Sequence, residues 1–288
     1  MVSASKIGII VLNYNGGRYL LSCLASLAQL DYPNKEIVVV DNASEDGSLV
    51  EAEKRFPQLT FVRNQANEGF AKGMNIGMRM ALAHGARACL LFNNDATLDP
   101  HALTALVEAS ERHPEAGLLC PIIYESGSER PWFEKGKIDF FRMRAVHLRA
   151  TKAERLSDAY ASGYLTGCAL FIKRELIDAI GFLDERFFLY YEDADYSFRA
   201  SRAGFACLVV PGARVWHSEA SRSNPQKTYF LVYSGLLFFQ KHASLLMRPY
   251  LAAYVTIRRV KNHLDRLRGR GGAAEDVHRA YEHFFSKR

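Results

Sequence analysis

The first 125 residues alternate between short apolar runs and longer segments with helical periodicity. Four runs are each followed by polar or glycine-containing residues: Ile7–Leu12, Ile37–Val40, Leu59–Val62 and Ala88–Phe92. Short, continuously apolar runs are typical of strands buried on both faces of a parallel sheet. The segments between them would cover such a sheet with helices, so the pattern predicts an α/β fold with a Rossmann-like, mostly parallel central sheet.

The pattern weakens in the middle of the chain and then returns. Glu125–Ala161 is rich in charged and aromatic residues without clear periodicity. We expect it to form a long, partly mobile segment over the working edge of the sheet, because loops of this length are usually functional or disordered. Beyond it, Thr166–Ile172 and Phe205–Val210 are predicted strands, and Asp193–Ala203 is a predicted helix.

Polar clusters follow several of the predicted strands or lie in later segments that return to the same edge. They are Asn13-Tyr14-Asn15, Asp41-Asn42, Asn93-Asn94-Asp95, Glu192-Asp193 and His217. Because parallel strands place their carboxyl ends at one edge of the sheet, we expect these groups to converge at a ligand-binding crevice. Taken alone, Asn93-Asn94-Asp95 is explained equally well as a turn, since Asn and Asp are favoured there.

Together the clusters suit the transfer of a group away from a phosphorylated leaving group. One aspartate would hold Mg²⁺ or Mn²⁺, and phosphate oxygens and water would fill the remaining positions of the cation. A second carboxylate would take a proton. His217 is a candidate metal ligand, although a lone histidine is more often structural, here as a half-buried partner of Trp216.

Glu192, Asp193 and Asp195 open a predicted helix, where acids ordinarily cap the helix or complement its dipole. They follow the aromatic stretch Phe187–Tyr191, which could wall a pocket and raise the pKa of a carboxyl toward that of a useful base. Asp193 and Asp195 are about 200° apart around a helix, so at most one of them faces a ligand. We expect it to be Asp193.

Composition limits the class of protein. With 288 residues, 49% of them hydrophobic and 24% charged, the chain can bury one large α/β domain, with or without an appendix. The five cysteines are scattered and flanked by apolar residues, which indicates reduced core positions and a cytoplasmic protein. The first apolar run is too short for the core of a signal peptide, so no export is expected.

The C-terminal region is basic. Neither Tyr229–Phe239 nor Leu245–Ile257 reaches the roughly 20 apolar residues that a membrane-spanning helix needs. A basic helix with interleaved apolar residues suits the surface of an anionic membrane, which would make the protein peripheral on the inner face of the cytoplasmic membrane. A helix packed on the core with a solvated basic face explains it equally well. Nucleic acid is an unlikely partner, because no nucleic-acid-binding motif accompanies the tail.

Two common nucleotide-binding classes are disfavoured. The first predicted strand is followed by NYNGG rather than GxGxxG, which argues against a dinucleotide oxidoreductase. Asn67–Gly73 contains glycines and Lys72 but lacks the spacing of a P-loop. A nucleotidyltransferase would need a glycine-rich, basic loop after the first strand, which NYNGG does not supply.

The order of the motifs resembles family 2 inverting glycosyltransferases over residues 6 to 242. The matching segments are Ile10–Asn15, Val39–Ser48, Asn67–Asn75, Leu91–Asp95, Thr166–Ala169, Tyr191–Asp195 and Trp216-His217. The resemblance implies a GT-A fold in residues 1–242, with a nucleotide-binding part at about 6–125 and an acceptor-binding part at about 126–242. Residues 243–288 would form a basic helical extension. Trp132-Phe133 near Gly136–Asp139 is similar to bacterial rhamnosyltransferases of envelope polysaccharide synthesis.

The resemblance also implies roles for individual residues. Asp193 matches the general base, which deprotonates an acceptor hydroxyl for in-line attack on the anomeric carbon, and Asp95 and His217 match the metal site. The resemblance implies that the donor is a nucleotide-diphosphate sugar and that the acceptor is a saccharide or lipid-linked saccharide. Each of the two substrates would be bound by its own set of residues. Donor-binding residues would be Asn13, Asn15, Asp41, Lys72, Asn93, Asn94 and Asp95, and acceptor-binding residues Trp132, Tyr191 and Glu192.

The sequence departs from the family pattern at Asn93, which replaces the first aspartate of the DxD motif, and at Ser234, where relatives often carry asparagine. The first departure motivates an alternative function, a non-catalytic protein of the same fold that binds a nucleotide or glycan.

Overall fold

The computed structural model describes residues 4–218, 224, 226–269 and 271–286. Its strands are β1 (Ile7–Asn13), β2 (Lys35–Asp41), β3 (Thr60–Arg63), β4 (Ala88–Asn93), β5 (Ala96–Leu98), β6 (Ala116–Glu125), β7 (Pro131–Phe133), β8 (Lys135–Asp139), β9 (Arg144–Leu148), β10 (Tyr160–Ala161), β11 (Ala169–Lys173) and β12 (Ala206–His217). Its helices are α1 (Gly17–Ala28), α2 (Ser48–Arg55), α3 (Gly69–Ala83), α4 (Ala102–Arg112), α5 (Lys152–Leu156), α6 (Arg174–Ile180), α7 (Glu192–Arg202), α8 (Lys227–His242), the 3₁₀ helix η2 (Leu245–Met247), α9 (Arg248–Leu267) and α10 (Ala273–Ser286).

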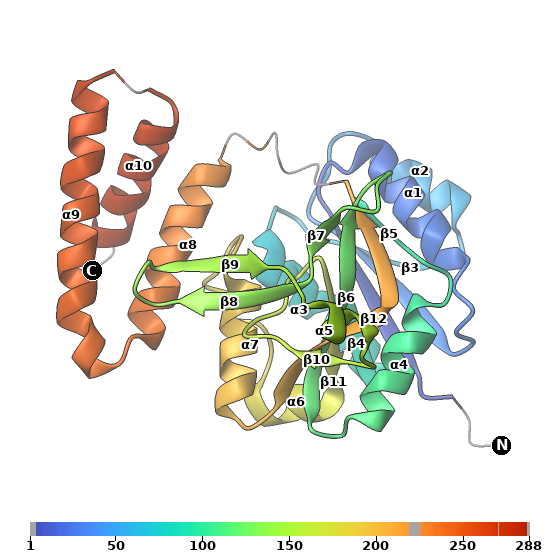
Figure 1. Cartoon of the computed structure of the whole chain (residues 1–288). Helices are drawn as coiled ribbons and strands as arrows, with labels where there is room; N and C mark the ends of the chain where they lie inside the picture. Colours follow the sequence, from blue (N-terminus) through green and yellow to red (C-terminus); the bar gives the residue numbers. More distant parts are fainter. Residues whose placement is uncertain (1–3, 219–223, 225, 270, 287–288) are drawn as a thin grey trace.

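One sheet organises the molecule, in the order β10-β12-β6-β11-β4-β1-β2-β3, with β5 paired to β12 and β7 to β6 (Figure 1). The strands β3, β2, β1 and β4 are parallel to one another. Because β11 is antiparallel to both β4 and β6, the strands β6 and β12 run in the same direction as β4. The predicted α/β fold with a mostly parallel sheet is therefore confirmed.

The central strands are apolar throughout because both of their faces are covered. A Cβ added to Gly77 of α3 would lie 2.4 Å from the Ile10 side chain, and one added to Gly73 would lie 2.4 Å from the Leu12 side chain. Only glycine allows α3 to approach β1 this closely. Ile9 and Val11 alternate with these strand residues, point to the opposite face and are also fully buried.

The segment 125–161 is more regular than expected. It was expected to be a long, partly mobile loop, but it contains β7, the antiparallel β8–β9 hairpin, the short helix α5 and β10. Its strands are short and only partly buried, and a hairpin that exposes side chains on both faces lacks a clean apolar alternation. In Figure 1 this hairpin extends from the sheet toward α8.

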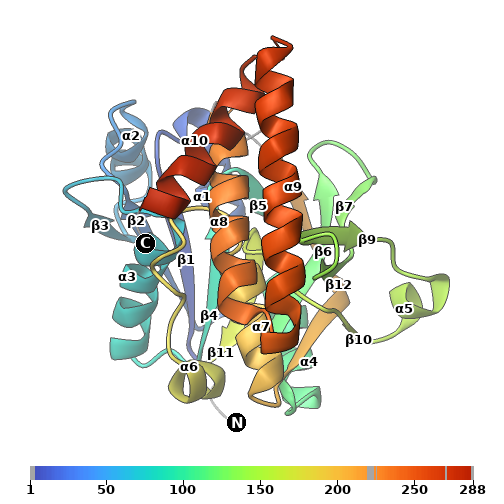
Figure 2. The ribbon, with the colours of Figure 1, turned by 90° about the vertical axis from the view of Figure 1, so that its left-hand side faces the viewer.

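The C-terminal helices pack beside the sheet domain through α8 (Figure 2). Phe238 and Phe239 of α8 belong to the main hydrophobic core. The other side of α8 contributes Leu236 to a smaller cluster with Val255 of α9 and with Tyr281 and Phe284 of α10; this second cluster holds α9 and α10 against α8.

Two further expectations concern the whole chain. All five cysteines are buried and unpaired, as their apolar flanks predicted. Among the helices that the structure describes, no segment combines the length and apolarity required to cross a bilayer.

Candidate active site

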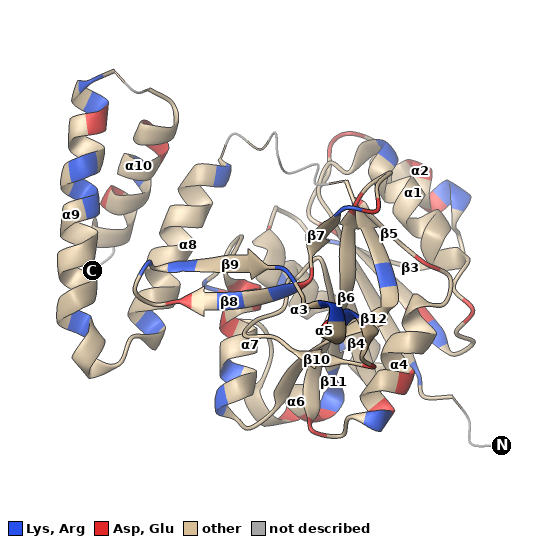
Figure 3. Cartoon of the chain, viewed as in Figure 1, with Lys and Arg blue, Asp and Glu red and all other residues tan. Residues whose placement is uncertain are grey.

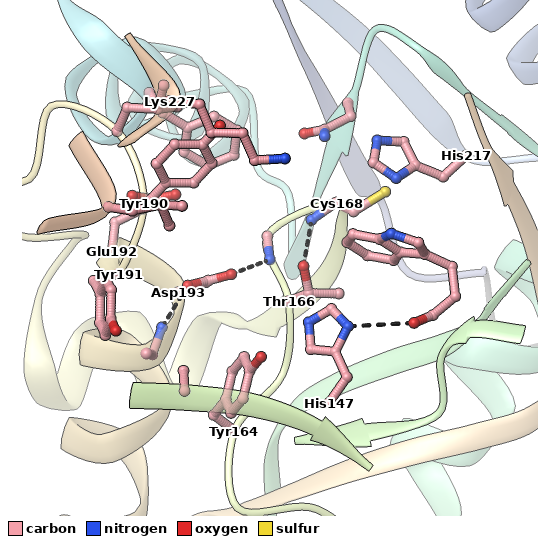
Figure 4. A pocket seen from close by; sticks show the side chains of 18 residues that line it. His147, Tyr164, Thr166, Cys168, Tyr190, Tyr191, Glu192, Asp193, His217 and Lys227 are labelled. Atoms are coloured by element: carbon pink, nitrogen blue, oxygen red, sulfur yellow. Dashed lines mark hydrogen bonds between the residues drawn. The ribbon is translucent and has the colours of Figure 1, made fainter. Parts of the chain in front are cut away.

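A pocket of about 410 Å³ opens beyond the carboxyl end of β4 (Figure 4). Its volume is typical of small-molecule sites. It brings together several sequence-predicted residues, namely Asn93, Trp132, Tyr191, Glu192, Asp193 and His217. We refer to this cavity as the main pocket.

Asp193 lies at the start of α7 and is held by the backbone. Its Oδ2 accepts a hydrogen bond from the Gly167 N–H at 2.9 Å, and its Oδ1 accepts one from the Ala194 N–H at 2.7 Å (Figure 4). Tyr190 and Tyr191, just before the helix, adopt φ values of 66° and 67°. Bulky residues rarely adopt this left-handed conformation, which costs roughly 1–3 kcal/mol per residue, so the turn must be held by its surroundings.

The contacts that hold this turn come from distant segments. The Phe70 N–H donates to the Phe188 carbonyl at 2.6 Å, and Ser234 Oγ donates to the Leu189 carbonyl at 2.8 Å. The structure therefore gives Ser234, the second departure from the family pattern, a role in positioning the loop that precedes Asp193.

Asp195 has a different environment from Asp193. It is fully buried and accepts from Arg199 at 2.9 Å, from Lys241 at 2.5 Å and from His242 at 2.7 Å. Its carboxylate is neutralised within the protein and does not line the main pocket. The helical rotation that separated Asp193 from Asp195 is thus observed.

The two pocket carboxyls differ in their electrostatics. Burial raises the pKa of Glu192 well above its ordinary value, and the Asp193 charge raises it further. Burial also raises the pKa of Asp193, while the N–H groups of Gly167 and Ala194 and the nearby His147 act in the opposite direction. Glu192 Oε2 has no hydrogen-bond partner among the described residues. The two N–H groups thus favour the charged form of Asp193, whereas burial and the Asp193 charge favour the protonated form of Glu192.

A second corner of the site contains Asp95 and His217. Antiparallel pairing of β5 with β12 sets His217 opposite Ala96, next to Asp95. Both side chains are buried, and His217 Nε2 lies 3.1 Å from Asp95 Oδ1 without good hydrogen-bond geometry. His217 packs edge-on against Trp132 with ring centroids 4.7 Å apart. The expected alternative partner, Trp216, instead lies against Tyr124 with ring centroids 6.3 Å apart, because alternate residues of β12 point to opposite faces.

Asp95 and His217 offer two side chains that could coordinate a divalent cation. His217 Nδ1 has no hydrogen-bond partner among the described residues, and a carboxylate oxygen lies beside the other ring nitrogen. A carboxylate and an imidazole suit Mn²⁺ or Mg²⁺ when substrate phosphates and water complete the coordination. Within the described ranges no group of three or more His, Cys, Asp or Glu side chains is placed to hold a metal. The residues present fit a cation that the protein holds with two side chains.

Other predicted donor residues form a polar network behind the main pocket. Asn13 is fully buried, and its Nδ2 donates to Asp41 Oδ1 at 2.8 Å, its register neighbour across β1 and β2. Asn94 Nδ2 donates to Asn13 Oδ1 at 2.9 Å, and Asn15 Oδ1 accepts from the Glu45 N–H at 2.9 Å. These hydrogen bonds connect the polar side chains at or just after the ends of β1, β2 and β4. The expected convergence of these groups at one edge of the sheet is therefore observed.

Lys72 lies apart from this network. It is on the first turn of α3 and pairs with Glu68 at 2.5 Å. The described residues that line the main pocket include neither Lys72 nor the polar residues Asn13, Asn15, Asp41, Asn94 and Asp95.

The main pocket also contains residues that sequence reasoning missed. They are chiefly His147, Tyr164 and Lys227, together with Phe70 and Thr166, which lie in the matching motifs but had no assigned role. Tyr190, which also lines the pocket, belongs to the aromatic stretch that was expected to wall it. His147, on β9, lies within 3.2 Å of the Trp132 carbonyl through Nδ1 and packs edge-on against the Trp132 ring. The sequence around His147 did not indicate a role for it, because the β8–β9 hairpin lacks a clear alternation of apolar and polar residues.

Comparisons with known proteins agree with this geometry. The model of the family described as Glycosyl transferase family 2 matches residues 8–181, more than half of the chain. The N-acetylglucosaminyl-diphospho-decaprenol L-rhamnosyltransferase of Mycobacterium tuberculosis is 29% identical over 232 residues, which are 74% of this chain and 76% of the relative. The dTDP-rhamnosyl transferase RfbF of Shigella flexneri is 22% identical over 256 residues, 84% of this chain and 83% of that protein.

Solved structures show the same fold. GalNAc-T7 with UDP, GalNAc and Mn²⁺ superposes with a TM-score of 0.64 at 20% identity, over 75% of this chain and 44% of that chain. The mannosyltransferase PcManGT from Pyrobaculum calidifontis, in complex with GDP-Man and Mn²⁺, gives a TM-score of 0.58 at 19% identity, over 97% of this chain and 74% of that chain. The chain therefore belongs to glycosyl transferase family 2 and is a glycosyltransferase with a GT-A fold.

Proposed function

We propose that the protein transfers a sugar from a nucleoside-diphosphate sugar to a hydroxyl of a saccharide acceptor, with inversion at the anomeric carbon. The observation that carries the proposal is the Asp193 carboxylate, oriented by two backbone N–H groups in a pocket that also reaches His217. The names of the relatives support rhamnose as the sugar, a dTDP-linked donor and an acceptor linked to a diphosphoprenol. We place the reaction in cell-envelope polysaccharide synthesis.

Asp193 would act as the general base. The acceptor hydroxyl gives its proton to the Asp193 carboxylate as its oxygen forms a bond to the anomeric carbon. The bond from that carbon to the diphosphate oxygen breaks at the same time, and the electron pair leaves with the nucleoside diphosphate. Because the displacement occurs once, the configuration inverts. A raised carboxyl pKa makes Asp193 a stronger base than an ordinary aspartate.

We assign the remaining roles from the family resemblance together with the positions of the residues. Asp95 and His217 would hold Mg²⁺ or Mn²⁺, which when bound neutralises charge on the departing diphosphate. Asn93 lines the main pocket beside this corner, in the place of a second carboxylate. Asn13, Asn15, Asp41, Asn94 and Lys72 would shape or contact the nucleotide side. Trp132, Tyr191 and Glu192 would contact the acceptor.

A thermal-shift and turnover experiment tests this function. dTDP-rhamnose, UDP-GlcNAc and GDP-mannose are compared with and without Mn²⁺, since a ligand that binds only the folded state raises its stability. Products of hydrolysis or transfer are then measured for each stabilising donor. Stabilisation without any turnover, even with added acceptors, would favour the alternative of a non-catalytic binding protein. The replacement of the first DxD aspartate by Asn93 is the observation behind that alternative.

We also propose that α9 lies on an anionic membrane surface at the cytoplasmic side. Its Val255 and Asn262 face inward and are buried. The opposite side carries a stripe of exposed apolar residues at intervals of three or four residues, formed by Ile257, Val260, Leu264 and Leu267. Lys and Arg residues recur along the same helix (Figure 3). An apolar stripe with basic flanks favours the interface of an anionic bilayer.

Vesicle sedimentation tests the membrane proposal. The double variant Ile257→Ser/Leu264→Ser should bind vesicles of phosphatidylglycerol and phosphatidylcholine more weakly than the wild type. Leu156→Ser removes a comparably exposed leucine far from α9 and is the matched control. Equal sedimentation of all three proteins would refute the role of the stripe.

A further inference from the structure

A second cavity of about 450 Å³ lies next to the main pocket. It is enclosed by the tip of the β8–β9 hairpin and by α8, α9 and α10. Tyr191 and Leu231 line both cavities, so they form a shared wall. Tyr191 directly precedes the carboxyl pair of α7, and Gly235 of α8 lies against its ring.

Three arginines meet at this cavity from two separate elements. Arg142 and Arg144 come from the hairpin and Arg258 comes from α9. Among the described residues that line it there is no Asp or Glu, and none of the three guanidinium groups forms an ion pair within the described part of the chain. Figure 3 shows Lys and Arg at the hairpin tip and along the facing helix α9. We call this cavity the arginine pocket.

Specific contacts hold the hairpin tip against α9. The Tyr250 hydroxyl donates to the Phe141 carbonyl at 2.6 Å, and the Tyr254 hydroxyl donates to the Arg142 carbonyl at 3.1 Å. The rings of Phe141 and Tyr250 also pack edge-on, with centroids 5.9 Å apart. The structure thus places three exposed arginine side chains around one cavity, and Asp139 interacts electrostatically with one of them, Arg142. A cluster of this kind creates a positive potential that attracts anions.

The lining of the arginine pocket indicates the kind of anion. Beside the three guanidinium groups, its walls are formed by the apolar side chains of Met143, Leu231, Val232, Leu236 and Val255 and by the tyrosines Tyr191, Tyr254 and Tyr281. Guanidinium groups bind phosphate oxygens in a bidentate manner, and apolar walls suit a hydrocarbon chain attached to the phosphate. A ligand with both parts is a prenyl diphosphate.

The donor's diphosphate does not account for this pocket. The corner proposed for it contains Asp95 and His217, and neither residue lines the arginine pocket. An anion bound in the arginine pocket would therefore belong to the other substrate. Tyr191 separates the arginine pocket from Asp193, which places an anionic group on one side of the wall and the reacting hydroxyl on the other.

We infer that the arginine pocket binds the diphosphate and first prenyl units of a lipid-linked acceptor, whose sugar extends past Tyr191 to Asp193. This inference rests on the proposed sugar transfer and names the acceptor class. Arg142, Arg144 and Arg258 are the residues that recognise the diphosphate.

Farnesyl diphosphate is a probe for this site that contains no sugar. Its affinity is measured by titration calorimetry for the wild type, for Arg144→Ala/Arg258→Ala and for Arg144→Lys/Arg258→Lys. Arg268→Ala is the matched control, since Arg268 is exposed on the same helical region and lines neither cavity. The alanine pair should weaken binding by about tenfold to a hundredfold, from the loss of charge-assisted hydrogen bonds. The lysine pair should recover part of the affinity, and Arg268→Ala should bind like the wild type.

Three controls define the result. Saturating dTDP should leave farnesyl diphosphate binding intact, and full competition would overturn the inference by placing the probe in the donor site. Inorganic pyrophosphate should bind much more weakly than farnesyl diphosphate, and equal affinity would refute a lipid-linked ligand in favour of a free anion. Farnesol should bind weakly to every variant. Identical farnesyl diphosphate affinities for the wild type and the alanine pair would also refute the inference.

The proposed function fails in a different experiment. The probe carries no transferable sugar, so its binding does not depend on Asp193 or on the identity of the donor. If no sugar transfer is detected but the probe still binds in an arginine-dependent manner, the proposed function is wrong and the proposed ligand of the arginine pocket stands. If sugar is transferred to an uncharged alkyl glycoside but the probe does not bind, the proposed function stands and the proposed ligand of the arginine pocket is wrong.

Discussion

Replacing Asp193 with asparagine tests the central chemical proposal. Asparagine keeps the shape of the side chain and one oxygen acceptor but loses the ability to take a proton. Proton transfer by a positioned base contributes roughly 10²–10⁴-fold to rate. We therefore expect kcat to fall by that factor, which corresponds to about 2.7–5.5 kcal/mol of barrier.

The same substitution has a calculable effect on folding. Asp193 accepts hydrogen bonds from two backbone N–H groups, and an asparagine amide would face one of them with its NH₂. Losing one hydrogen bond to a charged group costs roughly 1.5–3 kcal/mol, and removing a buried charge offsets part of that cost. The variant should remain folded with a modestly lower Tm. Donor binding should persist, because the proposed diphosphate site is at Asp95 and His217.

Glu192→Gln is the matched control in the same turn of helix. The pKa of Glu192 is raised by burial and by the Asp193 charge, so glutamine imitates the protonated form already present. Because Glu192 is also a proposed acceptor contact, the effect of this substitution should appear in the KM for the acceptor, and kcat should fall far less than in Asp193→Asn. In the wild type, kcat should fall as the pH drops through the pKa of Asp193, which burial places above 3.8. Turnover of Asp193→Asn at the wild-type rate, or loss of activity in Glu192→Gln alone, would refute the assignment of the base.

Three further outcomes are expected. The folded-state pKa of Glu192 is raised, so above pH 4.5 the unfolded state releases this proton before the folded state does. The contribution of Glu192 to the free energy of unfolding therefore falls by up to about 1.36 kcal/mol per pH unit until the folded-state pKa is passed. Urea unfolding of Glu192→Gln should lack this loss, and parallel pH profiles of the two proteins would contradict it. Asp95→Asn should weaken Mn²⁺-dependent donor binding about tenfold or more by calorimetry, whereas unchanged Mn²⁺ dependence would remove Asp95 from the metal site. Gly69→Ala should lower the free energy of unfolding by about 1–3 kcal/mol in urea, because Gly69 has a φ of 78° and a Cβ there would lie 2.5 Å from the Phe188 carbonyl oxygen. A wild-type unfolding midpoint would show that this turn can relax.

Local patterns predicted the parts of the fold whose burial is uniform. The strands β1, β2 and β4 are covered on both faces, so each is a continuous apolar run that stands out from its neighbours. The same patterns predicted polar strand ends, and the structure brings Asn13 and Asp41 into register across β1 and β2. The β8–β9 hairpin was not predicted, since its partly exposed strands lack a readable period.

The candidate site divides in the same way. Helical geometry predicted that at most one of Asp193 and Asp195 faces a ligand, and the family resemblance selected Asp193. His147 could not, because its approach to the main pocket depends on how the hairpin packs against Trp132. The protonation order of Glu192 and Asp193 was equally inaccessible. It depends on a hydrogen bond from Gly167, which lies 26 residues earlier in the chain.

The sequence by itself determined the α/β architecture, the family and the residues that carry charge at the strand ends. These features depend on the periodicity of side chains within one element and on short motifs. Only the tertiary structure decided which ionisable groups from distant segments meet: Asp95 with His217, and Arg142 and Arg144 with Arg258 around one cavity. Electrostatic interactions depend on distance and burial in three dimensions, and neither quantity is present in the order of residues along the chain.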